Sequence, residues 1–93
     1  MKSKINILKN NIKNKNIVIL GAGISGQGAA LLAHLLGAKV LLSDIKKPKI
    51  IHKKLFNKNI ELEFGKHSAK CLKADLIIVS PGINLNKVNI IKK

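Results

Sequence analysis

The chain has 93 residues, which allows one small domain and excludes a binding domain joined to a catalytic domain. Apolar residues make up 46% of the chain and aromatic residues 2%, so it can form a hydrophobic core but has no aromatic platform on which single-stranded nucleic acid would stack. Its 18 basic residues against 4 acidic ones give a net charge of +14, but all 18 are lysines scattered along the chain, which favours a solvated surface over a phosphate-binding stripe.

The first predicted elements are a strand, a helix and a second strand. Residues 1–15 form a lead-in segment with no clear period. Asn16–Leu20 is an apolar, β-branched run typical of a strand buried on both faces. Ser25–Leu36 is rich in Ala and Leu and favours a helix that is apolar around most of its circumference, and a glycine ends it. Lys39–Ser43 is the second buried strand.

The rest of the chain predicts a connector and two further strands. Residues 45–59 are polar and carry only a weak amphipathic stretch. Ile60–Phe64 alternates apolar and acidic residues, as a strand with one wet face does. A short helix follows, capped by Ser68, and its Cys71 and Leu72 are expected to face inward.

The last two elements complete the pattern of a parallel sheet. Asp75–Ser80 predicts the fourth strand, and a further helix begins near Asn86. Strands alternating with helices and connectors predict an α/β fold: a Rossmann-like parallel sheet with helices on both faces.

A glycine-rich turn between the first strand and the first helix is the main candidate site. Its sequence is GxGxxG, with glycines at Gly21, Gly23 and Gly26, in the context that dinucleotide folds require. The first glycine permits the tight turn, the second lets a phosphate approach the backbone, and the third lets helix and strand pack closely. Free N–H groups at the helix start, with the hydroxyl of Ser25, would then face the phosphate.

Two further segments lie where the carboxyl ends of the strands bind ligands in open α/β sheets. Asp44 closes the second strand, where an acidic residue holds a ribose in such folds, and Lys46 follows it within reach of a phosphate. Ser80, Pro81 and Gly82 close the fourth strand, and the glycine would let a ligand approach the backbone. The alternatives are a surface acid or helix cap for Asp44, a solvated side chain for Lys46, and an ordinary strand-ending turn for residues 80–82. For the glycine turn, the alternative is a tight turn that binds nothing.

Other classes of chemistry have no support in the sequence. The three histidines and Cys71 lack metal-ligand spacing, no nucleophile–histidine–acid set can be assigned, and a Walker ATP loop is absent. A single cysteine cannot form an internal disulfide, and no apolar run is long enough for a membrane span or a signal peptide. We therefore expect a cytoplasmic protein with no catalytic residues and no metal site of its own.

Two stretches of the chain resemble the Mur ligase family. Ile17–Leu32, which contains the glycine turn, is similar to the opening of a Mur ligase. Gly65–His67 followed by Ala74–Ile83 is more specific and resembles the D-glutamate-adding branch of that family. The resemblance covers residues 16–93, and it covers only the first domain of such an enzyme.

This resemblance implies a UDP-binding, Rossmann-like N-terminal domain at residues 16–93, from a ligase of peptidoglycan synthesis. Such enzymes activate the carboxylate of UDP-N-acetylmuramoyl-L-alanine with ATP and Mg²⁺ as an acyl phosphate, which D-glutamate then attacks. Their ATP loop, metal ligands and catalytic residues belong to a central domain. The chain alone is therefore expected to bind no cofactor, to be inactive, and to have the remaining ligase domains as its partners. A fifth strand of the family's sheet is expected to be missing here or to lie beyond the C-terminus.

The resemblance also implies roles for single residues. Ile24 and Ser25 would lie against the uridine diphosphate, Asp44 and Lys46 near the uracil and ribose, and Gly82 beside the uracil. An NAD(H)-binding regulatory or redox domain is the alternative, because the glycines and Asp44 suit it equally well. A basic nucleic-acid binder is a third possibility, disfavoured by the absence of arginine and the scarcity of aromatics.

Overall fold

The computed structural model describes residues 11–80 of the chain. Four strands form one sheet in which every pair is parallel, in the order β3–β2–β1–β4. The strands are β1 (Asn16–Leu20), β2 (Lys39–Asp44), β3 (Ile60–Phe64) and β4 (Leu76–Val79). The predicted Rossmann-like sheet is therefore confirmed, with each strand within one residue of its expected bounds at either end. The helix expected from Asn86 lies outside the described residues.

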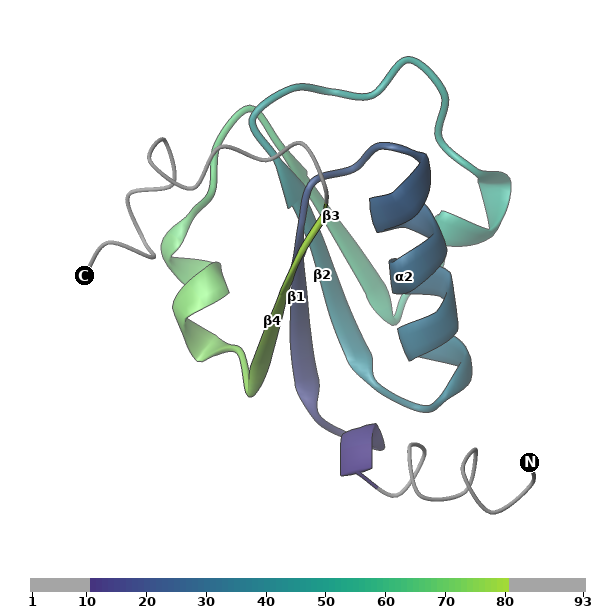
Figure 1. Cartoon of the computed structure of the whole chain (residues 1–93), viewed down its shortest axis with the longest axis vertical. Helices are drawn as coiled ribbons and strands as arrows, with labels where there is room; N and C mark the ends of the chain where they lie inside the picture. The colour runs from purple at the N-terminus through teal and green to yellow at the C-terminus, as the bar shows by residue number, and fades with distance from the viewer. Residues whose placement is uncertain (1–10, 81–93) are drawn as a thin grey trace.

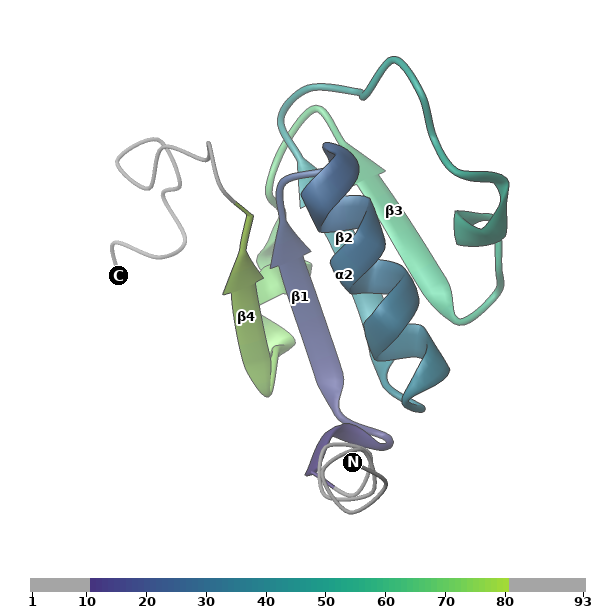
Figure 2. The same cartoon turned by 45° about the vertical axis from the view of Figure 1, so that its right-hand side comes forward.

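Helical elements cover both faces of this sheet, as predicted. Helix α2 (Ile24–Leu35) packs on one face together with the short 3₁₀ helix η1 (Lys53–Leu55). A second 3₁₀ helix, η2 (Ala69–Lys73), lies on the opposite face, as Figures 1 and 2 show. The α2 face is the better covered of the two, because α2 runs along most of the sheet.

The core between α2 and the sheet combines branched and small side chains. Ile17, Ile19 and Leu42 point from β1 and β2 toward α2, which meets them with Ala30 and Ala33. Alanines at this contact allow the helix to lie close to the strands. A smaller cluster on the other face gathers buried side chains of the two central strands around a cysteine of η2, and it consists of Val18, Leu20, Leu41 and Cys71.

One expectation about a buried side chain is wrong. Leu72 faces outward with 61% of its surface exposed, because the 3₁₀ helix presents only one side to the sheet and Cys71 occupies it. The apolar surface of α2 is only partly buried, since Leu32 and Leu35 are largely exposed. Within residues 11–80, no helix is both long enough and apolar enough to cross a bilayer.

Candidate functional site

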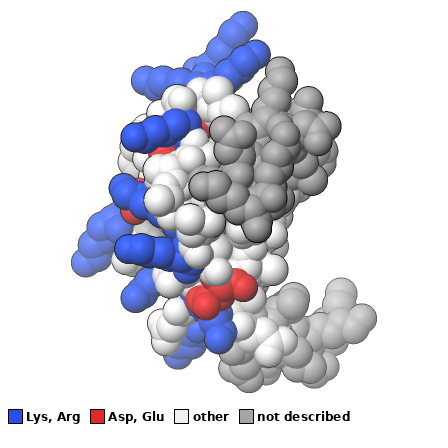
Figure 3. Space-filling view, turned by 90° about the vertical axis from the view of Figure 1, so that its left-hand side faces the viewer, with Lys and Arg blue, Asp and Glu red and all other residues white. Residues whose placement is uncertain are grey.

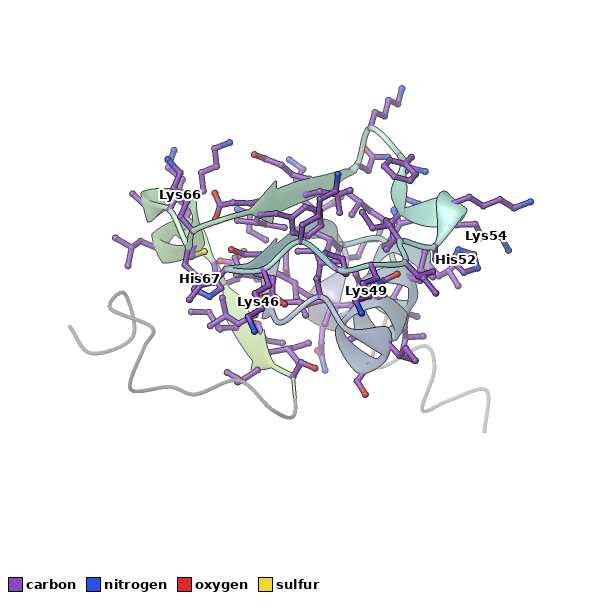
Figure 4. The ribbon with its side chains drawn as sticks, turned by 90° about the horizontal axis from the view of Figure 1, so that it is seen from above. Lys46, Lys49, His52, Lys54, Lys66 and His67 are labelled. Carbon is purple, nitrogen blue, oxygen red and sulfur yellow. The ribbon has the colours of Figure 1, made fainter. Side chains whose placement is uncertain are left out.

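The candidate site lies at the edge of the sheet where all four strands have their carboxyl ends. Figure 4 shows this edge from above, with the turn between β1 and α2 and the connector that leaves β2 meeting over it. Parallel strands bring the residues that follow them to the same edge, which is why segments distant in the sequence meet here.

Two glycines fix the shape of the turn between β1 and α2. Gly21 has a φ of +109°, a conformation that side-chain-bearing residues rarely adopt. A Cβ placed on Gly26 would lie 1.7 Å from the carbonyl oxygen of Gly21, so only glycine lets α2 start this close to β1. Gly23 is different, because a Cβ there would meet no atom within 4 Å. Its side of the turn is open.

The first turn of α2 presents backbone donors to solvent. Gly23, Ile24 and Ser25 are exposed, and no side chain caps the helix. Within the described residues no hydrogen bond takes the N–H groups of Ile24 and Ser25. Unpartnered N–H groups at a helix start, aided by the helix dipole, form an anion-binding site. Among residues 11–80, no atom lies within 4 Å of where a Cβ on Gly23 would be, so this part of the chain leaves the turn open.

The carboxylate of Asp44 joins the glycine turn to the connector. Its Oδ2 accepts the N–H of Ala22 at 2.7 Å, and its Oδ1 accepts the N–H of Lys46 at 3.0 Å. One residue earlier, the carbonyl of Ser43 accepts the N–H of Gly21 at 2.8 Å. Asp44 and Lys46 therefore lie beside the glycine turn, but the N–H of Ala22 is held by Asp44 and is not open to a ligand.

Ser80 reaches the same edge from the fourth strand. Its N–H donates to the carbonyl of Leu20 at 2.8 Å, directly before the glycine turn, and the residue is buried. Pro81 and Gly82, the other two candidates from this segment, lie outside the described residues.

Gln27 is a polar residue of the site that the sequence analysis did not select. Only 8% of it is exposed, and its carboxamide makes three hydrogen bonds. Nε2 donates to the carbonyls of Ala22 at 2.9 Å and Ile50 at 2.7 Å, and Oε1 accepts the N–H of His52 at 2.8 Å. One sign of this role was present in the sequence. Gln27 precedes Ala30 by three residues, which places both on the same face of the helix, and Ala30 faces the core.

A second polar network, also absent from the sequence analysis, supports β2 and β3 beside the site. The Ser43 hydroxyl lies 2.8 Å from Glu63 Oε1 and 2.7 Å from His67 Nδ1. Glu63 also accepts hydrogen bonds from the hydroxyl and the amide of Ser68, the cap of η2. A serine directly after the apolar run of residues 40–42 in β2 was the sign of this network in the sequence.

The network determines the ionisation of two of its members. Burial raises the pKa of the Glu63 carboxyl, but hydrogen bonds from Ser68 and Ser43 and the charge of Lys70 outweigh it and leave this pKa below its ordinary value. Burial raises the pKa of the Cys71 thiol, since the thiolate would be desolvated next to the Glu63 carboxylate. Cys71 is thus a packing residue here and not an activated nucleophile.

Comparison with known sequences identifies relatives of the whole described domain. Residues 15–93 match the family model for the N-terminal domain of Mur ligases of the MurD-like type. The UDP-N-acetylmuramoylalanine–D-glutamate ligase of Pediococcus pentosaceus is 40% identical over 77 residues, and that of Bacteroides thetaiotaomicron is 46% identical over 71 residues. These matches cover 77% and 74% of this chain but 17% and 16% of the two ligases.

Comparison with solved structures identifies the fold. The bacillithiol disulfide reductase Bdr (YpdA) of Bacillus cereus superposes with a TM-score of 0.60 at 18% identity, over 74% of this chain and 29% of the reductase. Tmm from Pelagibacter sp. strain HTCC7211 superposes with a TM-score of 0.59 at 20% identity, over 80% of this chain and 19% of Tmm. At these identities the likeness establishes the α/β architecture alone.

Proposed function

This chain belongs to the family of MurD-like N-terminal domains of Mur ligases, and from that premise we propose that it binds the uridine diphosphate part of UDP-N-acetylmuramoyl-L-alanine. One observation carries the proposal: at the exposed start of α2, next to Gly23, the N–H groups of Ile24 and Ser25 have no partner among residues 11–80. A diphosphate satisfies such donors and is favoured by the dipole of the helix.

We assign separate parts of the ligand to separate segments of the edge. The diphosphate contacts the amides of Gly23, Ile24 and Ser25 and the Ser25 hydroxyl, while Gly21 and Gly26 shape the turn. The ribose and uracil lie toward Asp44 and toward the segment of Ser80, Pro81 and Gly82, with Lys46 near the ribose and within reach of the diphosphate. The nearness of Asp44 and Ser80 to the turn, through hydrogen bonds to Ala22 and Leu20, supports this arrangement.

The complete activity is proposed for the longer ligase to which such a domain belongs. In it, the substrate carboxylate is activated by ATP and Mg²⁺ as an acyl phosphate and attacked by D-glutamate, in the cytoplasmic synthesis of peptidoglycan. The sequence has no Walker loop to hold the phosphates of ATP, and residues 11–80 hold no cluster of three His, Cys, Asp or Glu side chains. The chain by itself is therefore expected to bind the UDP ligand and to catalyse nothing.

A domain that binds NAD(H) is the second candidate function. The observation in its favour is Asp44 at the end of β2, where an acidic side chain holds a ribose diol in dinucleotide folds. Here both carboxylate oxygens of Asp44 already accept backbone N–H groups, from Ala22 and Lys46. Each oxygen keeps a second lone pair for a ribose hydroxyl, so Asp44 suits either nucleotide. We favour the UDP ligand because of the family match.

Titration of the ¹⁵N-labelled chain with UDP-N-acetylmuramoyl-L-alanine, UDP and NADH in parallel tests this proposal. We expect the two uridine ligands to shift the amides of Gly23, Ser25 and Gly82, and NADH to shift them less. An absence of shifts at millimolar uridine ligand, or a stronger response to NADH, contradicts the proposal.

A pair of alanine substitutions makes the test specific to the turn. Gly23→Ala keeps the fold, because its Cβ meets nothing within 4 Å, but it places a methyl group where the phosphate approaches. We expect it to weaken UDP binding by about tenfold or more. Gly28→Ala is the matched control, since it lies further along α2 with equally open space and should bind UDP as the unaltered chain does. Equal binding by both variants contradicts the assigned contact.

A further inference from the structure

The carboxamide of Gln27 connects two segments that are distant in the sequence. Its nitrogen donates to the carbonyl of Ala22 in the glycine turn and to that of Ile50 in the connector, and its oxygen accepts the N–H of His52. Both amide hydrogens and the carbonyl oxygen of this carboxamide make hydrogen bonds, and only 8% of the residue is exposed. The side chain therefore acts as a bridge between α2 and the connector.

This bridge is one of two sets of hydrogen bonds that hold residues 46–49, a segment with three lysines, at its two ends. At the segment's start, Asp44 accepts the N–H of Ala22 and the N–H of Lys46. At its end, Gln27 bonds the carbonyl of the same Ala22 and residues 50–52. Residues 46–49 are thus held at both ends to one residue of the glycine turn, Ala22.

The fastened segment carries exposed positive charge next to the phosphate site. Lys46, Lys47 and Lys49 are exposed, and the connector holds no acidic residue. Figure 4 shows the labelled Lys46 and Lys49 extending to the side of the connector on which the turn between β1 and α2 lies. The cation on such a flexible side chain contributes to anion binding only when its backbone is held in place.

Packing alone does not require an amide at this position. A buried polar group is stabilising only when all of its hydrogen bonds are made, and an apolar side chain of the same size would fill the space without them. The amide instead fixes the position of the backbone of residues 50–52 relative to α2, through its bonds to Ile50 and His52.

We propose that Gln27 is a positioning residue for nucleotide binding: it holds the connector against the glycine turn so that Lys46 and Lys49 stand beside the diphosphate. This inference rests on the proposed function and adds a residue that does not itself touch the ligand. Loss of the bridge should lower affinity for UDP by lowering the contribution of the two lysines.

The first test replaces Gln27 by methionine, which keeps the length of the side chain and removes its three hydrogen bonds. Gln27→Met should bind UDP roughly tenfold more weakly, and its affinity should depend less on salt, because fewer cations contact the phosphates. Combined with Lys46→Ala and Lys49→Ala, its effect should be much smaller than in the unaltered chain. A purely structural role would leave the effects additive and the salt dependence unchanged, and that result overturns the inference.

A second pair of variants cuts the bridge from the connector, so that α2 is untouched. His52 has a φ of −59°, which proline can adopt, and His52→Pro removes the N–H that Gln27 accepts. His52→Ala removes the imidazole, which accepts from the N–H of Lys54, but keeps the backbone N–H and is the matched control. UDP binding should weaken in the proline variant relative to the alanine variant, and equal affinities overturn the inference.

Two controls separate this inference from the proposed function. Lys39→Ala removes a lysine at the opposite end of β2 and should leave UDP binding unchanged. If the unaltered chain does not bind UDP, the proposed function fails. If it binds and the folded Gln27→Met chain, verified by its amide spectrum, binds equally well, only the positioning role of Gln27 fails.

Discussion

The glycines of α2 differ in what surrounds them. A Cβ on Gly26 would lie 1.7 Å from the Gly21 carbonyl oxygen, whereas one on Gly28 would lie in open space. We predict that Gly26→Ala lowers the free energy of unfolding by about 3 kcal/mol or more, because β1 and α2 must move apart.

Gly28→Ala should instead raise the free energy of unfolding by about 0.5–1 kcal/mol, because alanine favours the helix more than glycine does. Urea denaturation measures the free energy of unfolding of both variants, and we expect the two changes to have opposite signs. A Gly26→Ala chain as stable as the unaltered one would show that the tight contact between α2 and β1 is not required.

Residues of the site differ in how far the sequence could predict them. Gly21 and Gly26 were predictable because their roles depend on the local backbone conformation and on a contact between two residues that are close together in the sequence. Gln27 was not predictable, because its partners Ile50 and His52 follow it by 23 and 25 residues and become neighbours only in the fold. Asp44 was found by its position, but its bonds to backbone N–H groups could be seen only in the structure.

At the scale of elements, the sequence predicted strands better than short helices. The β-branched runs of β1 and β4 were located to within one residue at each end, because buried parallel strands have continuous apolar sequences. The segment at Ala69–Lys73 proved to be a 3₁₀ helix, and the outward position of Leu72 followed from that. Five residues are too few to show which face a helix will bury.

The contact between β3 and η2 predicts a measurable pH dependence. Hydrogen bonds and Lys70 hold the pKa of Glu63 below its ordinary value despite burial, so the carboxylate stabilises the folded chain above the unfolded pKa of about 4.3. That contribution is lost as the pH falls through the lower pKa of the folded state. Glu63→Gln should therefore be less stable by about 1 kcal/mol at pH 7, with a difference that narrows below about pH 4.

Thermal unfolding between pH 3 and pH 7 tests this expectation. Glu61→Gln is the control, because Glu61 lies on the same strand and makes only an exposed ion pair with Lys70, which should matter little to stability. A difference between Glu63→Gln and the unaltered chain that stays constant over this range would contradict a role for the ionised carboxylate.

At the scale of the whole molecule, charge is the property least explained by the fold. Figure 3 shows lysine side chains along one side of the molecule, with few acidic side chains among them. Within residues 11–80, the one ion pair shorter than 4 Å joins Lys70 and Glu61. A net charge of +14 on 93 residues is thus mostly uncompensated and repels itself in the compact state.

We therefore predict that the chain becomes more stable as salt is added. Raising NaCl from about 10 mM to about 150 mM shortens the Debye length from roughly 30 Å to roughly 8 Å, which screens repulsion between dispersed lysines and has few attractive pairs to weaken. Urea denaturation at the two salt concentrations should show a rise in the free energy of unfolding. Replacing the exposed Lys15 and Lys53 by glutamine should stabilise the chain at low salt and reduce that rise, because their effect comes from net charge and not from a local contact. A free energy of unfolding that falls as salt is added would contradict this prediction. It would mean that attraction between charges outweighs repulsion, although residues 11–80 contain a single ion pair.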